Sequence, residues 1–245
     1  GISARKAGDF SDALPDDRKV LDAIRAGDAQ RALHRMAVML SDTRTNAGLD
    51  NISTYRKMFT FEEPGERVIV IMTAGSLSVT QTTIAQLREA IDDREATPET
   101  SIMLAPTLLK VAEIVGARLA HVRAEVDEKL SAMQGASASM IVAGQRKGGA
   151  MRLFLIYPEG NFIEATEDTP FLQIGEHKYG KPILDRVVKP ATSLSDGQKA
   201  VLLSMDSTLR SNLSVGMPLD LAVIERDACK VMQKRRIEAG DPAFR

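Results

Sequence analysis

From residue 37 onward, the pattern of apolar and polar positions predicts three successive strands. Residues 37–40 form a short apolar segment. Residues 52–61 are rich in residue types that favour strands and alternate between apolar and polar positions. Residues 68–73 form a continuous β-branched run, which is typical of a strand buried on both faces. The Pro64-Gly65 pair is a turn signal, so the second and third strands are expected to form a hairpin.

Helical periodicity then replaces the strand pattern. Residues 77–94 and 106–133 carry apolar positions on a 3.6-residue period, with Pro98 and Pro106 at the break between the two helices. Strand patterns return at 139–143, 151–157 and 161–165, joined by the hairpin loop 144–149 and the turn 158–160. Two further helices, at 177–188 and 195–212, precede a strand at 219–225.

The two ends of the chain differ from this pattern. Pro15 suits a first helical position, and Gly27-Asp28 is a stop-and-restart signal, so residues 1–36 are predicted to form a helical hairpin. Residues 229–245 are polar and are expected to form an irregular tail. The interpretation is an atypical extension (1–36), a main domain (37–228) and a tail (229–245).

The order of elements also indicates the fold class. Strands that cluster, rather than alternate singly with helices, argue against a doubly wound parallel sheet. Two antiparallel sheets packed on each other, with a helical pair on each outer face, accommodate every predicted element. The predicted fold is therefore α+β, a four-layer αββα sandwich.

Composition excludes several classes of protein. The 245 residues carry 32 basic and 33 acidic side chains, a balance that disfavours a nucleic-acid binder. Cys229 is the single cysteine, so no disulfide within the chain is possible. The first ten residues contain no apolar run typical of a signal peptide, and apolar runs of about five residues are too short to span a bilayer. We expect a cytoplasmic protein that neither binds nucleic acid nor crosses a membrane.

The common catalytic and cofactor motifs are absent from the sequence. His34, His121 and His177 lack ligand-like spacing, so neither a metal nor a cofactor is expected. The segment 144–149 (GQRKGG) has glycines and cations but not the spacing of a phosphate-binding loop. No nucleophile elbow of the G-x-S-x-G type occurs either.

A candidate site without histidine remains. Asp42 and Arg44 lie two residues apart after a short strand, face the same way, and can form a charge-assisted pair. Lys57, next to Met58 on the following strand, can lend positive potential to a nearby nucleophile. Gly75 falls where a buried strand gives way to a helix, so its N–H can serve an oxyanion hole. The alternative interpretation is an exposed ion pair and a turn glycine.

Four long stretches resemble one family. Residues 41–58 (SDTRTNAGLDNISTYRKM) and 65–75 (GERVIVIMTAG) are similar to consecutive segments of Anbu, the proteasome-related "ancestral β subunit" family of bacteria. Residues 174–186 (IGEHKYGKPILDR) and 206–216 (DSTLRSNLSVG) are similar to later segments of the same family. The resemblance covers about residues 38 to 228 and implies the αββα fold of N-terminal-nucleophile hydrolases.

The resemblance also implies a chemistry. In this group a threonine that begins the mature chain attacks the peptide carbonyl, while its own α-amino group acts as the base. Asp42 would orient Lys57, Lys57 would lower the pKa of the nucleophile, and the Gly75 N–H would stabilise the oxyanion. Asn212 and Ser214 would support the terminal amine, and Arg44 is carried as a supporting residue.

The nucleophile itself has no counterpart in this sequence. Counting back from Asp42 by the family's spacing reaches Ala26, inside the predicted helical extension. No threonine precedes Thr43, and Ser3 and Ser11 lie in an unlike context. The identity of the nucleophile therefore stays open.

Three hypotheses follow. The first is a threonine-type peptidase subunit that acts on unfolded protein segments, and the second is a catalytically inactive scaffold that keeps the fold without the nucleophile. The third makes residues 1–36 a ligand-binding or dimerising module. The resemblance implies a ring or spiral of identical subunits, and an ATP-dependent unfoldase is a possible partner.

Overall fold

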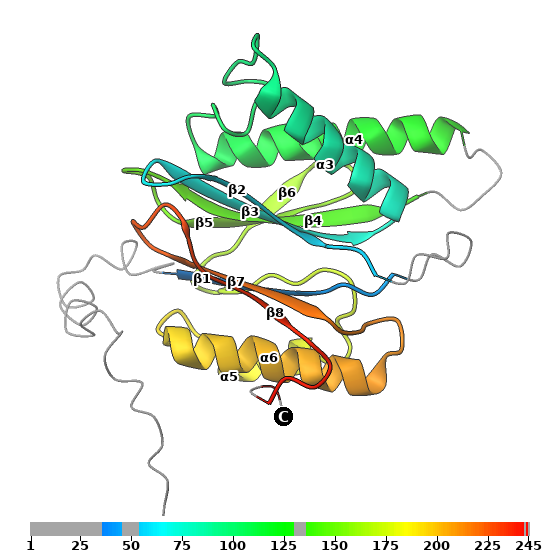
Figure 1. Cartoon of the computed structure of the whole chain (residues 1–245), viewed down its shortest axis with the longest axis vertical. Coiled ribbons are helices and arrows are strands. Elements are labelled where there is room, and N and C mark those ends of the chain that lie inside the picture. The colour runs from blue at the N-terminus through cyan, green and yellow to red at the C-terminus, as the bar shows by residue number, and fades with distance from the viewer. Residues whose placement is uncertain (1–35, 46–53, 130–135, 243, 245) are drawn as a thin grey trace, which may run out of the picture.

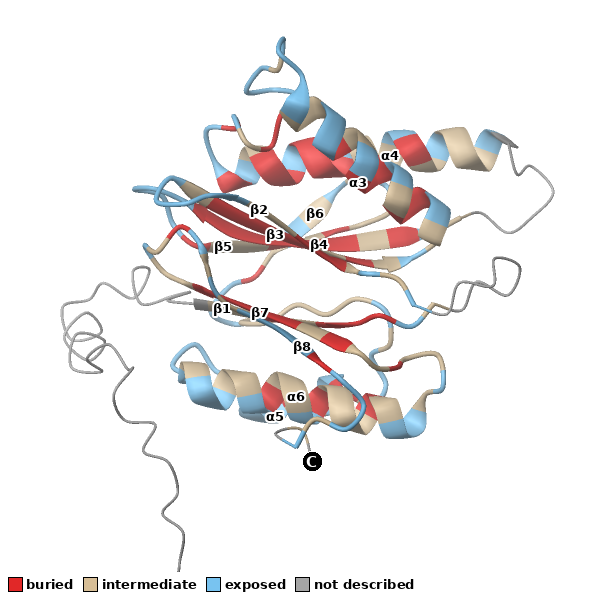
Figure 2. Cartoon of the chain, viewed as in Figure 1, coloured by how far each residue is buried: buried red, intermediate tan, exposed pale blue. Residues whose placement is uncertain are grey.

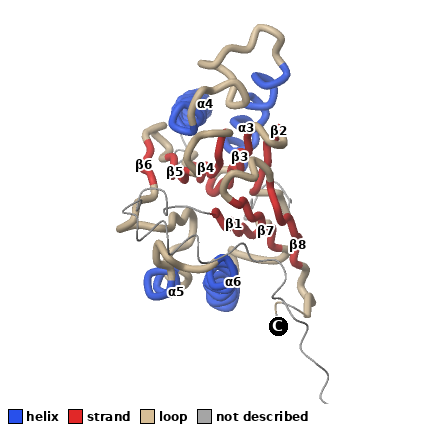
Figure 3. The backbone as a smooth tube through the Cα atoms, turned by 90° about the vertical axis from the view of Figure 1, so that its left-hand side faces the viewer, coloured by secondary structure: helices blue, strands red, loops and turns tan. Residues whose placement is uncertain are grey.

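The structure is a computed structural model that describes residues 36–45, 54–129, 136–242 and 244. The predicted helical hairpin of residues 1–36 lies outside these residues, apart from Met36. Figure 1 shows two β-sheets stacked face to face, with one pair of helices above and one pair below. In the perpendicular view the order helices, sheet, sheet, helices is again clear (Figure 3). The fold is the αββα sandwich predicted from the sequence.

The larger sheet has five antiparallel strands in the order β2-β3-β4-β5-β6. Its strands are β2 (Met58–Glu63), β3 (Arg67–Gly75), β4 (Ala138–Arg146), β5 (Arg152–Ile156) and β6 (Phe162–Glu164). The predicted hairpin is confirmed, because β2 pairs with β3 across a turn in which Gly65 has a φ of 83°. The second predicted strand begins later than expected, at Met58, and residues 46–53 lie outside the described part.

The smaller sheet has the order β1-β7-β8 among the described residues. Its strands are β1 (Met36–Asp42), β7 (Leu219–Glu225) and β8 (Val231–Ile237). The expected irregular tail was wrong for β8, which pairs with β7 along its length. Lys234, Arg235 and Arg236 are exposed, as is common on an edge strand, and these charges hid the strand pattern in the sequence.

Four helices cover the two sheets in the described part of the chain. They are α3 (Leu77–Asp92), α4 (Leu108–Lys129), α5 (Lys181–Val187) and α6 (Leu194–Ser211). Ser76 caps α3 by accepting a hydrogen bond from the Val79 N–H. Helix α5 is shorter than the predicted 177–188, because residues 178–180 form a turn ahead of it. No helix among the described residues is long and apolar enough to span a bilayer.

Two apolar clusters join the layers, and Figure 2 shows their buried residues on the inner faces of the elements. One lies between helices α3 and α4 and the five-stranded sheet, and includes Leu87, Leu119 and Phe154. The other includes Met39 of β1 and Met58 of β2, one residue from each sheet. This second cluster therefore packs the middle of β1 and the beginning of β2 into one apolar layer between the sheets.

A close contact between two glycines sets the distance between α4 and the turn before β6. A Cβ at Gly116 in α4 would overlap the carbonyl oxygen of Gly160, and a Cβ at Gly160 would lie 2.7 Å from the Gly116 oxygen. Both positions are backbone against backbone, so no side chain can move aside. Any larger residue at position 116 must push the helix away from the sheet.

We predict opposite effects for alanine at two helical glycines. Gly116→Ala should lower the free energy of unfolding by about 2 kcal/mol, because the helix must shift. Gly197→Ala in α6 should raise it by about 0.5 kcal/mol through helix propensity, since the nearest atom to its added Cβ is Val38 Cγ2 at an ordinary 3.8 Å. Urea denaturation of both variants measures the difference, and equal effects would contradict the contact between Gly116 and Gly160.

Candidate active site

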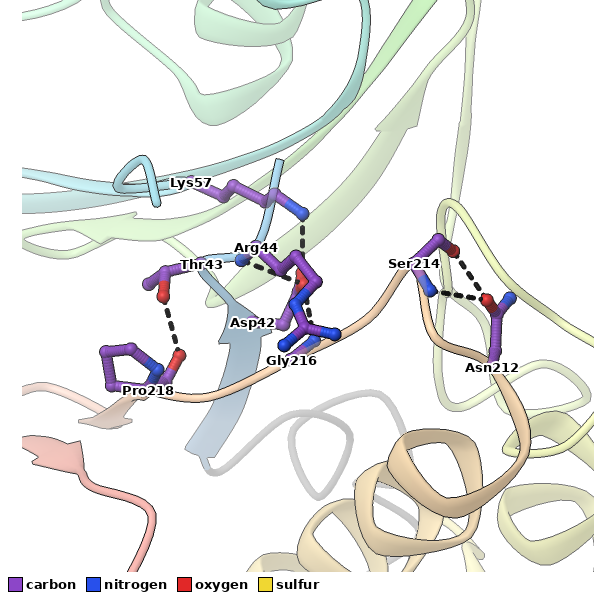
Figure 4. A network of polar contacts seen from close by, with 8 residues as sticks. All are labelled: Asp42, Thr43, Arg44, Lys57, Asn212, Ser214, Gly216 and Pro218. Atoms are coloured by element: carbon purple, nitrogen blue, oxygen red, sulfur yellow. Dashed lines mark hydrogen bonds and ion pairs between the residues drawn. The ribbon is translucent and has the colours of Figure 1, made fainter. Parts of the chain in front are cut away.

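Asp42, the last residue of β1, is the centre of the candidate site. Its side chain is only 11% exposed. Oδ1 accepts a hydrogen bond from Lys57 Nζ at 2.7 Å, and Oδ2 accepts from the backbone N–H groups of Arg44 at 3.1 Å and Gly216 at 3.2 Å. Both oxygens of this buried carboxylate are thus satisfied by donors from three chain segments (Figure 4).

Lys57 immediately precedes β2 and belongs to the five-stranded sheet through its backbone. Its carbonyl oxygen accepts from the Thr73 N–H of β3 at 2.9 Å. The Lys57 side chain, 21% exposed, points from this sheet toward β1, where its ammonium group meets Asp42. The ion pair therefore joins the two sheets; the family resemblance implied that Asp42 orients Lys57, but not that the contact crosses from one sheet to the other.

The expected side-chain pair between Arg44 and Asp42 was wrong. Only the backbone N–H of Arg44 bonds to Asp42; its guanidinium donates to the carbonyl oxygen of Leu213 at 2.7 Å. The guanidinium lies over Gly216, where an added Cβ would overlap Nε and stand 2.7 Å from Cζ. Arg44 thus binds the segment between α6 and β7. The sequence spacing of Asp42 and Arg44 could not reveal that the guanidinium bonds to Leu213.

Thr43 was not predicted to matter, yet it holds the same segment. It is 2% exposed, and its hydroxyl donates to the Pro218 carbonyl oxygen at 2.9 Å. Its carbonyl accepts from the Tyr55 N–H at 2.7 Å, close to Lys57 in the chain. In Figure 4 the Thr43 hydroxyl points to Pro218 and away from the ammonium group of Lys57.

Gly75 ends β3, with a φ of 105° that favours glycine. An added Cβ would overlap the carbonyl oxygen of Ser137 on the neighbouring segment. The Ser76 N–H donates to that Ser137 oxygen at 2.8 Å. Since N–H groups alternate in direction along a strand, the Gly75 N–H faces the opposite side, the side on which Thr73 donates to Lys57. Gly75 thus presents its N–H on the Lys57 side of β3.

Asn212 and Ser214 lie just after α6, on the segment that leads to Gly216 (Figure 4). Asn212 Oδ1 accepts from the Ser214 N–H at 2.8 Å and from the Ser214 hydroxyl at 2.6 Å. Asn212 Nδ2 donates to Glu176 Oε2 at 2.6 Å. These three residues line a shallow, open depression of the surface together with Gly175, His177 and Lys178. The sequence analysis missed Glu176, although it lies in a stretch that carried the resemblance.

The site thus brings together most of the residues singled out from the sequence. Asp42 and Lys57 are in contact, and Arg44 joins them to the segment that carries Ser214. Among the described residues, no group of three or more His, Cys, Asp or Glu side chains could hold a metal ion. The chemistry that this arrangement offers is a fixed ammonium group, backbone donors and a hydroxyl–amide pair.

Comparison with known sequences places the chain in a family. The sequence model described as "Proteasome subunit" matches residues 33–224. The chain belongs to the proteasome subunit family. Within it, the resemblance to Anbu is confirmed by solved structures that share well over a third of their residues with this chain. A search of curated proteins gave no match.

Three Anbu structures show how close the similarity is. Anbu from Hyphomicrobium sp. strain MC1 is 47% identical over 87% of this chain and 88% of its own, with a TM-score of 0.79. Anbu (ancestral beta-subunit) from Yersinia bercovieri is 43% identical over 86% of each chain, with a TM-score of 0.80. A structure described as a helical assembly of the Anbu complex from Pseudomonas aeruginosa is 46% identical over 84% of each chain, with a TM-score of 0.79.

We predict that Gly216 and Arg44 act as one unit. Gly216→Ala should displace the guanidinium from Leu213 and lower the free energy of unfolding by about 1 kcal/mol, and Arg44→Ala should do the same. Because both variants remove one interaction, the double variant should cost little more than either single one. Urea denaturation measures all three.

The matched control is Arg210→Ala, which removes an exposed arginine that pairs with Asp206 on α6. That substitution should change the unfolding free energy by less than about 0.5 kcal/mol. Additive effects of Gly216→Ala and Arg44→Ala would show that the arginine is not held over the glycine.

Proposed function

We propose that this protein is a proteasome-type subunit that hydrolyses peptide bonds by threonine-type chemistry. The observation that carries the proposal is the Asp42–Lys57 pair, with Nζ and Oδ1 at 2.7 Å. An ion pair on the protein surface contributes little to stability, and neither of its side chains has to be buried. A carboxylate fixed by three donors, in contrast, holds one ammonium group in a defined place, as a catalytic site requires.

In this proposal Lys57 supplies the positive field of the reaction. An ammonium group beside a hydroxyl nucleophile stabilises the alkoxide and so lowers the pKa of the hydroxyl. Asp42 is the residue that orients Lys57, and Arg44 supports the pair through its backbone N–H. None of these groups has to change its protonation state during the reaction.

Gly75 is the proposed oxyanion donor. Its N–H faces the side of β3 on which Lys57 lies, so a carbonyl attacked near Lys57 can place its developing negative charge against that N–H. A fixed backbone donor of this type needs no reorganisation when the charge forms. Ser214 and Asn212 would hold the amine that takes the proton from the nucleophile, through the hydroxyl that Asn212 orients.

Assembly is part of the same proposal. The Pseudomonas aeruginosa relative is described as a helical assembly, and we infer that this chain also associates with copies of itself. Enclosure of the sites within such an assembly would restrict the substrate to peptides and unfolded segments, which an ATP-dependent unfoldase could deliver.

The test is covalent labelling of the full chain with a β-lactone or epoxyketone directed at N-terminal nucleophiles. Intact-mass spectrometry should show a single adduct, and peptide mapping then identifies the nucleophile. Lys57→Ala should slow adduct formation by about 100-fold, because the ammonium group no longer stabilises the alkoxide.

Lys181→Ala provides the control, because it removes an exposed lysine that pairs with Asp185 on α5. That variant should label at the wild-type rate. If the wild-type protein stays unlabelled and cleaves no peptide, the peptidase proposal is wrong and a scaffold with the proteasome fold remains.

A further inference from the structure

Glu176 forms the outer end of a short hydrogen-bonded chain that leads to the candidate site. Its Oε2 accepts from Asn212 Nδ2 at 2.6 Å, and Asn212 Oδ1 in turn accepts from both the N–H and the hydroxyl of Ser214. These bonds connect the segment before α5 with the segment after α6. Each donor points the same way, from Ser214 through Asn212 to Glu176.

The direction of this chain is set at both of its ends, by the Glu176 carboxylate and by the backbone N–H of Ser214. An ionised carboxylate can only accept hydrogen bonds and a backbone N–H can only donate, whereas an asparagine side chain can turn either its oxygen or its NH₂ group toward a neighbour. Glu176 therefore requires the NH₂ group of Asn212 to face it. The amide oxygen of Asn212 must then face Ser214, and the Ser214 hydroxyl must donate to it.

The Ser214 hydroxyl therefore has a defined role in each of its hydrogen bonds. Its single hydroxyl proton is used on Asn212, so the lone pairs of Ser214 Oγ remain to accept a hydrogen bond from another group. If the amide of Asn212 were reversed, its NH₂ group would donate to Oγ and the Ser214 hydroxyl would become a donor instead.

We propose that Glu176 is a positioning residue that, together with the Ser214 N–H, orients the amide of Asn212 and so fixes the Ser214 hydroxyl as a hydrogen-bond acceptor. This rests on the proposed function in one respect: the group that Ser214 accepts from would be the amine that serves as the base. An amine that must take a proton needs its lone pair free, and an acceptor hydroxyl binds its N–H without occupying that lone pair.

The surroundings of Glu176 keep it in the form that this role needs. Its Oε1 accepts from the Lys178 N–H at 2.6 Å, and this bond, with smaller contributions from Asn212, His177 and Lys178, holds the Glu176 pKa below its usual value. Its own carbonyl accepts from Gln173 Nε2 at 2.6 Å. The carboxylate is thus ionised at neutral pH and held in place by its backbone neighbours.

The decisive test exchanges the hydrogen-bond donor and acceptor between positions 176 and 212. Glu176→Lys places a donor where the amide must donate, so the Asn212 amide should turn and the Ser214 N–H should lose its acceptor. Asn212→Asp places two carboxylates together and should also weaken the chain by repulsion. The double variant restores a donor–acceptor pair and lets the new carboxylate accept from both groups of Ser214.

Hydrogen exchange of the Ser214 amide gives a readout that does not need activity. We expect Glu176→Lys and Asn212→Asp each to speed exchange about tenfold and the double variant to return it to within about threefold of wild type. Glu99→Lys, which makes the same charge change in the α3–α4 connection, should leave it unchanged. A double variant no slower in exchange than the faster single variant overturns the proposal, because positions 176 and 212 would then not act through their mutual contact.

The rate of β-lactone labelling in the wild type, the two single variants and the double variant separates this inference from the proposed function. Labelling should fall in both single variants and recover in the double one. Rescue of exchange in a protein that never labels would support the positioning role of Glu176 and contradict the peptidase proposal. Labelling that is unaffected by Glu176→Lys would contradict the positioning role and leave the peptidase proposal standing.

Discussion

The carboxylate of Asp42 is the constraint on which the site depends. A buried carboxylate is strongly unfavourable unless its oxygens are paired and hydrogen-bonded. Asp42 meets this requirement with the Lys57 ammonium group and two backbone N–H groups. Because these donors come from three parts of the chain, satisfying one side chain also fixes the relative positions of those parts.

The sandwich brings those parts together by apolar packing. Met39 in β1 and Met58 in β2 lie in the same buried cluster, and each is close in the chain to one partner of the ion pair. Hydrophobic packing between the sheets thus places the end of β1 beside the residue before β2. The ion pair then adds the directional contact that packing alone does not supply.

The segment between α6 and β7 is held to this centre from several sides. Gly216 donates to Asp42, the Arg44 guanidinium donates to Leu213, and Thr43 donates to Pro218. Ser214 therefore occupies a fixed position relative to Lys57 even though no bond joins the two directly. This arrangement gives a physical reason for the glycine at position 216, where a side chain would displace Arg44.

The sequence predicted the fold well because strand and helix periods depend on local patterns of burial. The αββα layers, the β2–β3 hairpin and the place of Gly75 between a strand and a helix all follow from such patterns. Strand β8 did not, because an edge strand with one exposed face carries the charges of a polar tail.

Contacts between distant segments were harder to predict from one sequence. Nothing in the spacing of Asp42 and Arg44 indicates that the guanidinium binds Leu213, 169 positions later. The same holds for Glu176 and Asn212, which meet only because α5 and α6 pack side by side. Family resemblance marked the segments that contain these residues, but not their bonds.

A double-mutant cycle on Asp42 and Lys57 tests the central role of their contact most directly. Asp42→Asn, Lys57→Met and the double variant would be compared with wild type by urea denaturation. If the contact joins the two sheets, the coupling free energy should be at least about 1.5 kcal/mol. Effects that add to within about 0.5 kcal/mol would show that the two side chains are neighbours without mutual dependence, and that the site is organised in some other way.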